Sequence, residues 1–216
     1  MEVLDDRSYF WPFKFNYLMV PTVKHQEKVD YLLDKGLNIL WSRGYNGTSV
    51  NDIVAAADVP KGSFYFYFKS KEDFVVKALR RYYGLKRAAT LELLSESGYS
   101  PIRRLINYYT HRVTLIKEQL QCTMGCMSCN IGVEMAEHSE MIRNTIKNEE
   151  DKIRGEIIKV VKDAQAAGEI NPESDAGQLV AFIEDSYKGM LTSMKSSMSP
   201  EPLDNFLHFL RTIILK

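Results

Sequence analysis

Apolar residues recur at helical spacing along almost the whole chain after residue 23. The clearest stripe is formed by Val29, Leu32, Leu33, Gly36, Leu37, Leu40 and Trp41. Positions i, i+3, i+4, i+7 and i+8 share one face of an α-helix, so this stripe predicts a helix of about 20 residues with one buried face. No alternating pattern typical of a β-strand extends beyond a few residues. The sequence therefore predicts an all-α fold of about nine helices.

Glycine, proline and capping residues mark where the helices begin and end. Gly44 follows the first helix, as glycine often does at a helix C-terminus. Ser49, with Asp52 three residues later, predicts a capped start for the second helix. Further helices are expected over residues 50–57, 61–68, 71–95, 101–121, 122–137, 139–167, 175–196 and 200–215.

The charge of the chain is unevenly distributed. The 28 basic and 28 acidic residues give a net charge of zero, which by itself disfavours a nucleic-acid partner. Residues 21–90, however, hold twelve basic and seven acidic residues, net +5, whereas residues 91–216 are net −4 and residues 1–20 net −1. This split indicates an N-terminal part that faces an anion and a C-terminal part with another role.

Several functional classes can be set aside. No apolar run approaches the roughly 18–20 residues of a membrane span. There is no phosphate-binding loop, no Ser-His-Asp arrangement and no paired acidic motif, so we expect neither an enzyme nor a cofactor. The three cysteines and the absence of a secretion signal favour a reducing, cytoplasmic setting.

The chain is expected to have three parts. Residues 1–22 form an extension crowded with aromatic side chains, which either packs on the body or contacts a ligand or partner. Residues 23–70 form a helix-turn-helix domain, and residues 71–216 form a second, larger helical domain.

The segment 61–71 has the composition of a DNA-facing helix. It contains no acidic residue and combines lysines, a serine and tyrosines. Hydroxyl and ammonium groups donate to phosphate, and Gly62 would let the backbone approach a base edge closely. Phe64 and Phe68, four residues apart, are expected to be core.

Residues 28–79 resemble the N-terminal domain of the TetR (tetracycline-repressor) family of bacterial transcriptional regulators. The resemblance rests on the run from Gly44 to Ile53 and the run from Ala56 to Phe74, matched in order and spacing. Asp58 stands where the family commonly has Gly, and Asp also tolerates a turn conformation. Tyr67 stands where the family often has His. The resemblance implies a homodimer that binds a near-palindromic operator, usually as a repressor, and releases it on binding a small effector.

The DNA-binding residues implied by this resemblance fall into two sets. Thr48, Tyr65, Tyr67 and Lys71 would contact phosphates, and Lys61, Gly62 and Ser63 would lie nearest the base edges. Ser49 joins them as the cap of the second helix. The resemblance also implies that the two C-terminal helices pair with their copies in the dimer.

All three cysteines, Cys122, Cys126 and Cys129, fall within eight residues, on one face if the segment is helical. Three interpretations remain open. The thiols could pack in the core, act as a thiol sensor for electrophiles or oxidants, or bind a soft metal ion together with Glu134 or His138.

A second, shorter resemblance favours the thiol sensor. Gly125-Cys126, followed by Asn130-Ile131 and Glu134, is similar to the effector segment of the TetR subgroup that includes the repressor of N-ethylmaleimide reductase, which responds to electrophiles through cysteine. Cys126 is then the first candidate. Tyr108, His111 and Met135 are further candidates for the effector pocket, whose ligand would be a small apolar or electrophilic molecule.

Overall fold

The computed structural model describes residues 24–118 and 120–215, and within them every regular element is a helix. The aromatic extension at residues 1–22 lies outside the described residues. The nine α-helices of the described part are α1 (Lys24–Arg43), α2 (Val50–Ala56), α3 (Lys61–Tyr67), α4 (Lys71–Leu94), α5 (Pro101–Glu118), α6 (Met127–Met135), α7 (Glu140–Ala166), α8 (Ala176–Ser197) and α9 (Glu201–Phe209), the last followed by a π-helical turn at Leu210–Ile214. The expected all-α class is confirmed.

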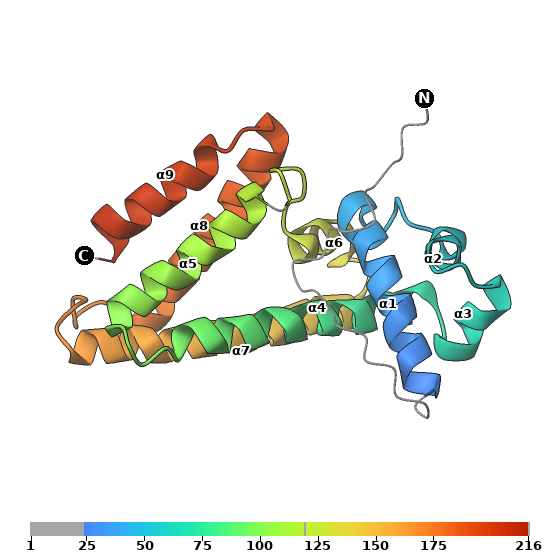
Figure 1. Ribbon diagram of the computed structural model, residues 1–216, viewed down its shortest axis with the longest axis horizontal. Helices are drawn as coiled ribbons and strands as arrows, with labels where there is room; N and C mark the ends of the chain where they lie inside the picture. The colour runs from blue at the N-terminus through green and yellow to red at the C-terminus, as the bar shows by residue number, and fades with distance from the viewer. Residues whose placement is uncertain (1–23, 119, 216) are drawn as a thin grey trace.

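Helices α1, α2 and α3 form a small unit at one end of the molecule (Figure 1). Gly44, with φ of +74°, turns the chain after α1, and Ser49 caps α2 by accepting a hydrogen bond from the Asp52 amide. Asp58 adopts the left-handed conformation, with φ of +51°. Phe64 of α3 is fully buried and packs on Phe74, so the start of α4 belongs to the core of this unit.

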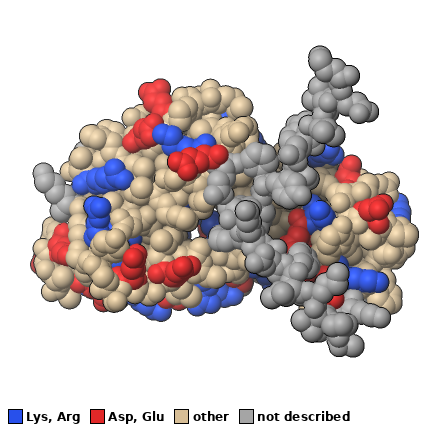
Figure 2. All heavy atoms as spheres, in the orientation of Figure 1, with Lys and Arg blue, Asp and Glu red and all other residues tan. Residues whose placement is uncertain are grey.

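The C-terminal body is built on two long helices. Helices α4 and α7 pack along each other, α5 and α8 pack on α7, and α9 lies outermost against α8 and α5 (Figure 1). Helix α6 lies between this body and α1 and packs on both α1 and α7. Figure 2 shows basic and acidic side chains interspersed over the visible face of this body.

The helix expected over residues 122–137 is shorter than predicted. Helix α5 ends at Glu118, and Gln121 and Cys122 both have positive φ, which breaks helical continuity. Helix α6 begins only at Met127, with Cys126 as its N-cap. The expectation that the three cysteines share one helical face is therefore wrong, because they lie in a left-handed turn, at a cap and inside a helix.

The apolar stripes of α8 and α9 face the interior of the same subunit. Ile183, Tyr187, Leu191 and Met194 of α8 are buried, as is Leu203 of α9. These stripes therefore account for the core. Among the described residues, no helix is long and apolar enough to cross a membrane.

Candidate functional site

Helix α3 presents an exposed face that carries most of the predicted DNA contacts. Lys61, Gly62 and Tyr65 are exposed and Ser63 is partly exposed, whereas Phe64 anchors the opposite face in the core. Tyr67 is partly buried and packs against that core. A Cβ at Gly62 would meet nothing within 4 Å, so the surface there is open to a close partner.

Thr48, Ser49 and Lys71 have local structural contacts. Thr48 is 1% exposed and its hydroxyl donates to the Gly44 carbonyl at 2.7 Å, so this hydroxyl faces inward. Ser49 is exposed and caps α2. The Lys71 ammonium lies 4.0 Å from the centre of the Tyr45 ring, and burial lowers its pKa.

A cavity of about 100 Å³ lies where α1, α4, α5, α8 and the segment before α6 meet. Its wall is mainly apolar and aromatic, and it contains no aspartate or glutamate. The lining residues are Trp41, Tyr82, Leu85, Lys86, Ala89, Thr90, Leu93, Tyr108, His111, Arg112, Leu115, Ile116, Leu120, Gly125, Cys126, Tyr187 and Leu191.

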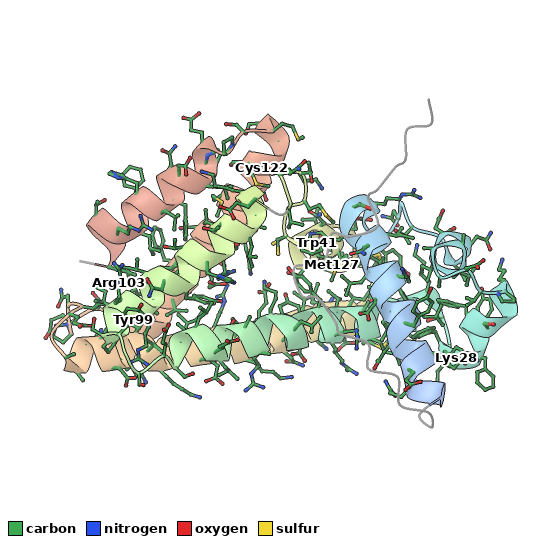
Figure 3. All side chains as sticks on the ribbon, in the orientation of Figure 1. Lys28, Trp41, Tyr99, Arg103, Cys122 and Met127 are labelled. Atoms are coloured by element: carbon green, nitrogen blue, oxygen red, sulfur yellow. The ribbon has the colours of Figure 1, made fainter. Side chains whose placement is uncertain are left out.

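The predicted effector residues divide into two groups. Cys126, Tyr108 and His111 line the cavity, whereas Cys122, Cys129 and Met135 do not. Cys122 is buried in the turn after α5, and Figure 3 shows it near the end of that helix, away from Trp41 and Met127 at the junction of α1 and α6.

Arg112 in the cavity wall belongs to a buried ion pair. Arg112 donates to Glu184 at 2.6 Å, and Tyr109 Oη donates to the same carboxylate at 2.9 Å. The Arg112 guanidinium also lies 3.7 Å from the centre of the Tyr187 ring. Although burial raises the pKa of Glu184, the charge of Arg112 and its hydrogen bonds outweigh burial and lower it. Each charge is therefore neutralised by the other.

The surroundings of Cys126 lower the pKa of its thiol. A hydrogen bond from the Cys129 thiol lowers the pKa of Cys126, and the Lys86 charge and the Ser128 hydroxyl, 3.0 Å from Cys126 Sγ, lower it further, against the effect of burial. Its place at the N-terminus of α6 also favours a negative charge. Cys129 carries the shared proton, and its pKa is raised.

Sequence reasoning missed Lys86 and Glu184. Neither was singled out, because each lies in a long helical segment whose other residues drew attention as apolar or surface positions. One signal in the sequence could have revealed Lys86. It lies four residues after Tyr82, on the helical face that also carries Leu93, and a charged residue is unusual on a face that becomes buried.

Hydrogen bonds connect both ends of helix α6 to the unit formed by α1, α2 and α3. Just before it, the Gly125 carbonyl accepts a 2.6 Å hydrogen bond from Trp41 Nε1 of α1. Near its end, the Glu134 carboxylate accepts hydrogen bonds from the backbone amides of Tyr45 (3.2 Å) and Asn46 (2.6 Å) in the turn before α2. The segment that carries Cys126 therefore contacts the helix-turn-helix directly.

Comparison with known families identifies both parts of this architecture. Residues 32–78 match the model for bacterial regulatory proteins of the tetR family, and residues 101–210 match the Tetracyclin repressor-like C-terminal domain. The chain belongs to the TetR family. Its members in these comparisons are transcriptional regulators, not enzymes.

Two curated TetR-family repressors are similar over most of their length. DhaR of Mycobacterium sp. strain GP1 is 32% identical over 177 residues, which cover 82% of this chain and 87% of DhaR. NemR of Escherichia coli K12 is 31% identical over 194 residues, which cover 86% and 92%. The crystal structure of E. coli NemR in its reduced form matches with a TM-score of 0.78 and 26% identity, covering 87% of this chain and 96% of NemR.

The metal interpretation of the cysteines gains no support from the geometry. Among the described residues of this TetR-family chain, no three His, Cys, Asp or Glu side chains gather in an arrangement that could hold a metal ion. The cysteine cluster of the sequence is instead split between a cavity wall and two positions outside it.

Proposed function

We propose that this TetR-family regulator is a homodimeric repressor that binds a near-palindromic operator through α3. We further propose that it releases the operator when a small electrophile or oxidant modifies Cys126. The observation that carries the proposal is the position of Cys126, which lies in the cavity wall at the start of a helix hydrogen-bonded to the DNA-binding unit. We expect the protein to act in the cytoplasm, where its operator would be.

The exposed face of α3 supports the DNA contacts. Lys61, Gly62 and Ser63 lie at the N-terminus of α3, where a recognition helix would reach base edges, and Tyr65 offers an exposed hydroxyl to phosphate. Ser49 and Tyr67 flank this face. Because the Thr48 hydroxyl is buried and Lys71 stacks on Tyr45, the proposal relies on these two less.

Dimerisation is supported by exposed apolar side chains on the last two helices. Phe182 of α8 is 60% exposed and Phe209 of α9 is 49% exposed, although most neighbouring apolar residues are buried. Two copies paired through these helices would present two α3 helices to two half-sites of one operator.

Operator binding tests the DNA-facing half of the proposal. A fluorescein-labelled operator obtained by selection from random DNA would be titrated with wild-type protein and with Lys61→Ala. We expect Lys61→Ala to lose about 1–3 kcal/mol at the selected sequence and to discriminate less between sequences. Lys162→Ala on the exposed face of α7 removes the same charge and should bind as wild type. Equal affinity of all three proteins for the operator would show that α3 is not the recognition helix.

Release of the same operator tests the sensing half. After treatment with iodoacetamide, wild-type protein and Cys122→Ser should lose at least about tenfold in operator affinity, an allosteric coupling of ordinary size. Cys126→Ser should bind before treatment and stay bound after it. If Cys126→Ser is released as readily as wild type, modification of another residue drives release. If treated wild type stays bound, the cavity instead holds a reversible apolar inducer or the thiols are only structural.

A further inference from the structure

Lys86 places a positive charge inside the cavity without a carboxylate partner among the described residues. The partly buried side chain lines the cavity, and its ammonium lies 5.1 Å from the ring centre of Tyr82 and 5.7 Å from that of Tyr83. No aspartate or glutamate lines the cavity. Glu150 and Glu184 line the adjoining pocket together with Lys86, but their ion pairs are with Lys188 and Arg112. The aromatic rings therefore compensate the Lys86 charge only in part.

The other nearby charges are already neutralised. Arg112 is paired with Glu184 at 2.6 Å, and Lys188 with Glu150 at 2.6 Å. Glu150 also accepts a hydrogen bond from the Tyr83 hydroxyl. With both carboxylates paired elsewhere, the acidic group left to balance Lys86 is the Cys126 thiol, which lines the same cavity and whose pKa the Lys86 charge lowers.

Modification of Cys126 changes this balance. When the thiolate forms a bond from sulfur to carbon, the product is a neutral thioether, and the negative charge facing Lys86 disappears. A neutral electrophile therefore leaves a buried cation without an anion, which is costly. An electrophile that carries its own negative charge restores the balance and is also attracted to Lys86 before it reacts.

We propose that the cavity selects small electrophiles that carry an anionic group such as a carboxylate, with Lys86 as the anchor and Cys126 as the nucleophile. This inference rests on the thiol-sensing half of the proposed function. In a substitution, the thiolate electron pair forms the bond to carbon and the leaving group departs with its bonding pair. In a conjugate addition, the π pair of the alkene moves toward the carbonyl oxygen and water supplies the proton to carbon.

Iodoacetate and iodoacetamide form a matched pair of probes, because they differ in charge but hardly in size and release the same iodide. The rate of modification at Cys126 would be followed by tandem mass spectrometry, which separates it from Cys122 and Cys129 within one peptide. The ratio of the iodoacetate rate to the iodoacetamide rate is the quantity of interest. A change in the fraction of thiolate affects both rates equally and cancels in this ratio.

We expect the ratio at Cys126 to be at least about tenfold higher in the folded wild-type protein than in the same protein unfolded in urea. Lys86→Gln should reduce the ratio to the unfolded value, and Lys86→Arg should retain most of the preference. Lys162→Gln, which removes an exposed lysine of α7 that does not line the cavity, should keep the wild-type ratio.

Two results would overturn the inference. One is an equal ratio in folded and unfolded wild-type protein, a comparison that needs no variant to fold. The other is a ratio that Lys86→Gln leaves unchanged. Both leave the proposed function standing if either reagent still releases the operator through Cys126, whereas a Cys126 that reacts with neither reagent in the folded protein would overturn both.

Discussion

At the scale of single residues, the chemistry of Cys126 depends on neighbours that include a residue far away in the sequence. Cys129 is close in sequence, but Lys86 lies on another helix and reaches the thiol only through the fold. The clustering of cysteines was therefore visible in the sequence, whereas the cation was not. Cys122, by contrast, belongs to the cysteine cluster of the sequence but lies outside the cavity.

The hydrogen bond between two thiols leads to a prediction about pH. Because the folded pKa of Cys126 is lowered, its thiolate persists as the pH falls below the range of a free thiol, and reactivity is lost only when the pH falls through the folded pKa. Removing the donor in Cys129→Ala should raise that pKa. The midpoint of the rate of iodoacetamide modification should then move to higher pH.

Cys129→Ser provides the matched control, because its hydroxyl can still donate to the thiolate. Its midpoint should lie between those of wild type and Cys129→Ala. Identical midpoints in all three proteins would mean that the Cys129 thiol does not set the reactivity of Cys126.

At the scale of elements, helices that bury one continuous face were predicted to within a few residues. The α4 helix, expected over 71–95, runs Lys71–Leu94, and α7, expected over 139–167, runs Glu140–Ala166. The segment from 120 to 126 could not be predicted, because its course is set by distant contacts such as the hydrogen bond from Trp41 to Gly125. Local periodicity contains no information about such a partner.

The position of α6 between cavity and turn predicts a decoupling variant. In Glu134→Gln, the amide oxygen can still accept a hydrogen bond, but the charge that strengthens both bonds to Tyr45 and Asn46 is lost. We expect the ratio of operator affinities before and after Cys126 modification to shrink by about fivefold, equivalent to about 1 kcal/mol of coupling. Titration of labelled operator with unmodified and alkylated protein measures it.

A merely structural role for Glu134 would weaken both affinities by the same factor and leave their ratio unchanged. Glu137→Gln, an exposed carboxylate just after α6, removes the same charge and should preserve the wild-type ratio. A Glu134→Gln protein whose ratio equals that of Glu137→Gln would show that the signal does not pass through this contact.

At the scale of the whole molecule, the apolar stripes of α8 and α9 belong to the core of one chain, whereas pairing of these helices was implied only by the family resemblance. The exposed aromatic rings of Phe182 and Phe209 lie beside those stripes, and no periodicity distinguishes them from solvent-facing residues. The fold class and the DNA-binding unit were predictable because each rests on local pattern. The surface proposed to join two copies was not predictable from pattern, because a second chain would complete it.

Phe182→Glu tests that surface. An apolar ring of this size, buried once in each subunit, contributes about 1.5–3 kcal/mol per copy, and a carboxylate in its place is repelled by its symmetry mate. We expect sedimentation equilibrium to show a shift from dimer to monomer and a matching loss of operator binding. Met141→Glu on α7, 46% exposed, introduces the same charge elsewhere and should leave the dimer intact.

The small volume of the cavity has a consequence for background chemistry. On the same measure a single water needs about 10–15 Å³, so a cavity of about 100 Å³ admits a small organic molecule. Cys126 is only 7% exposed, and the rate of thiol–disulfide exchange depends on access to the thiol. We therefore expect peptide-sized disulfides to exchange with Cys126 more slowly than with an exposed thiolate, which would limit spontaneous loss of the proposed sensing thiol.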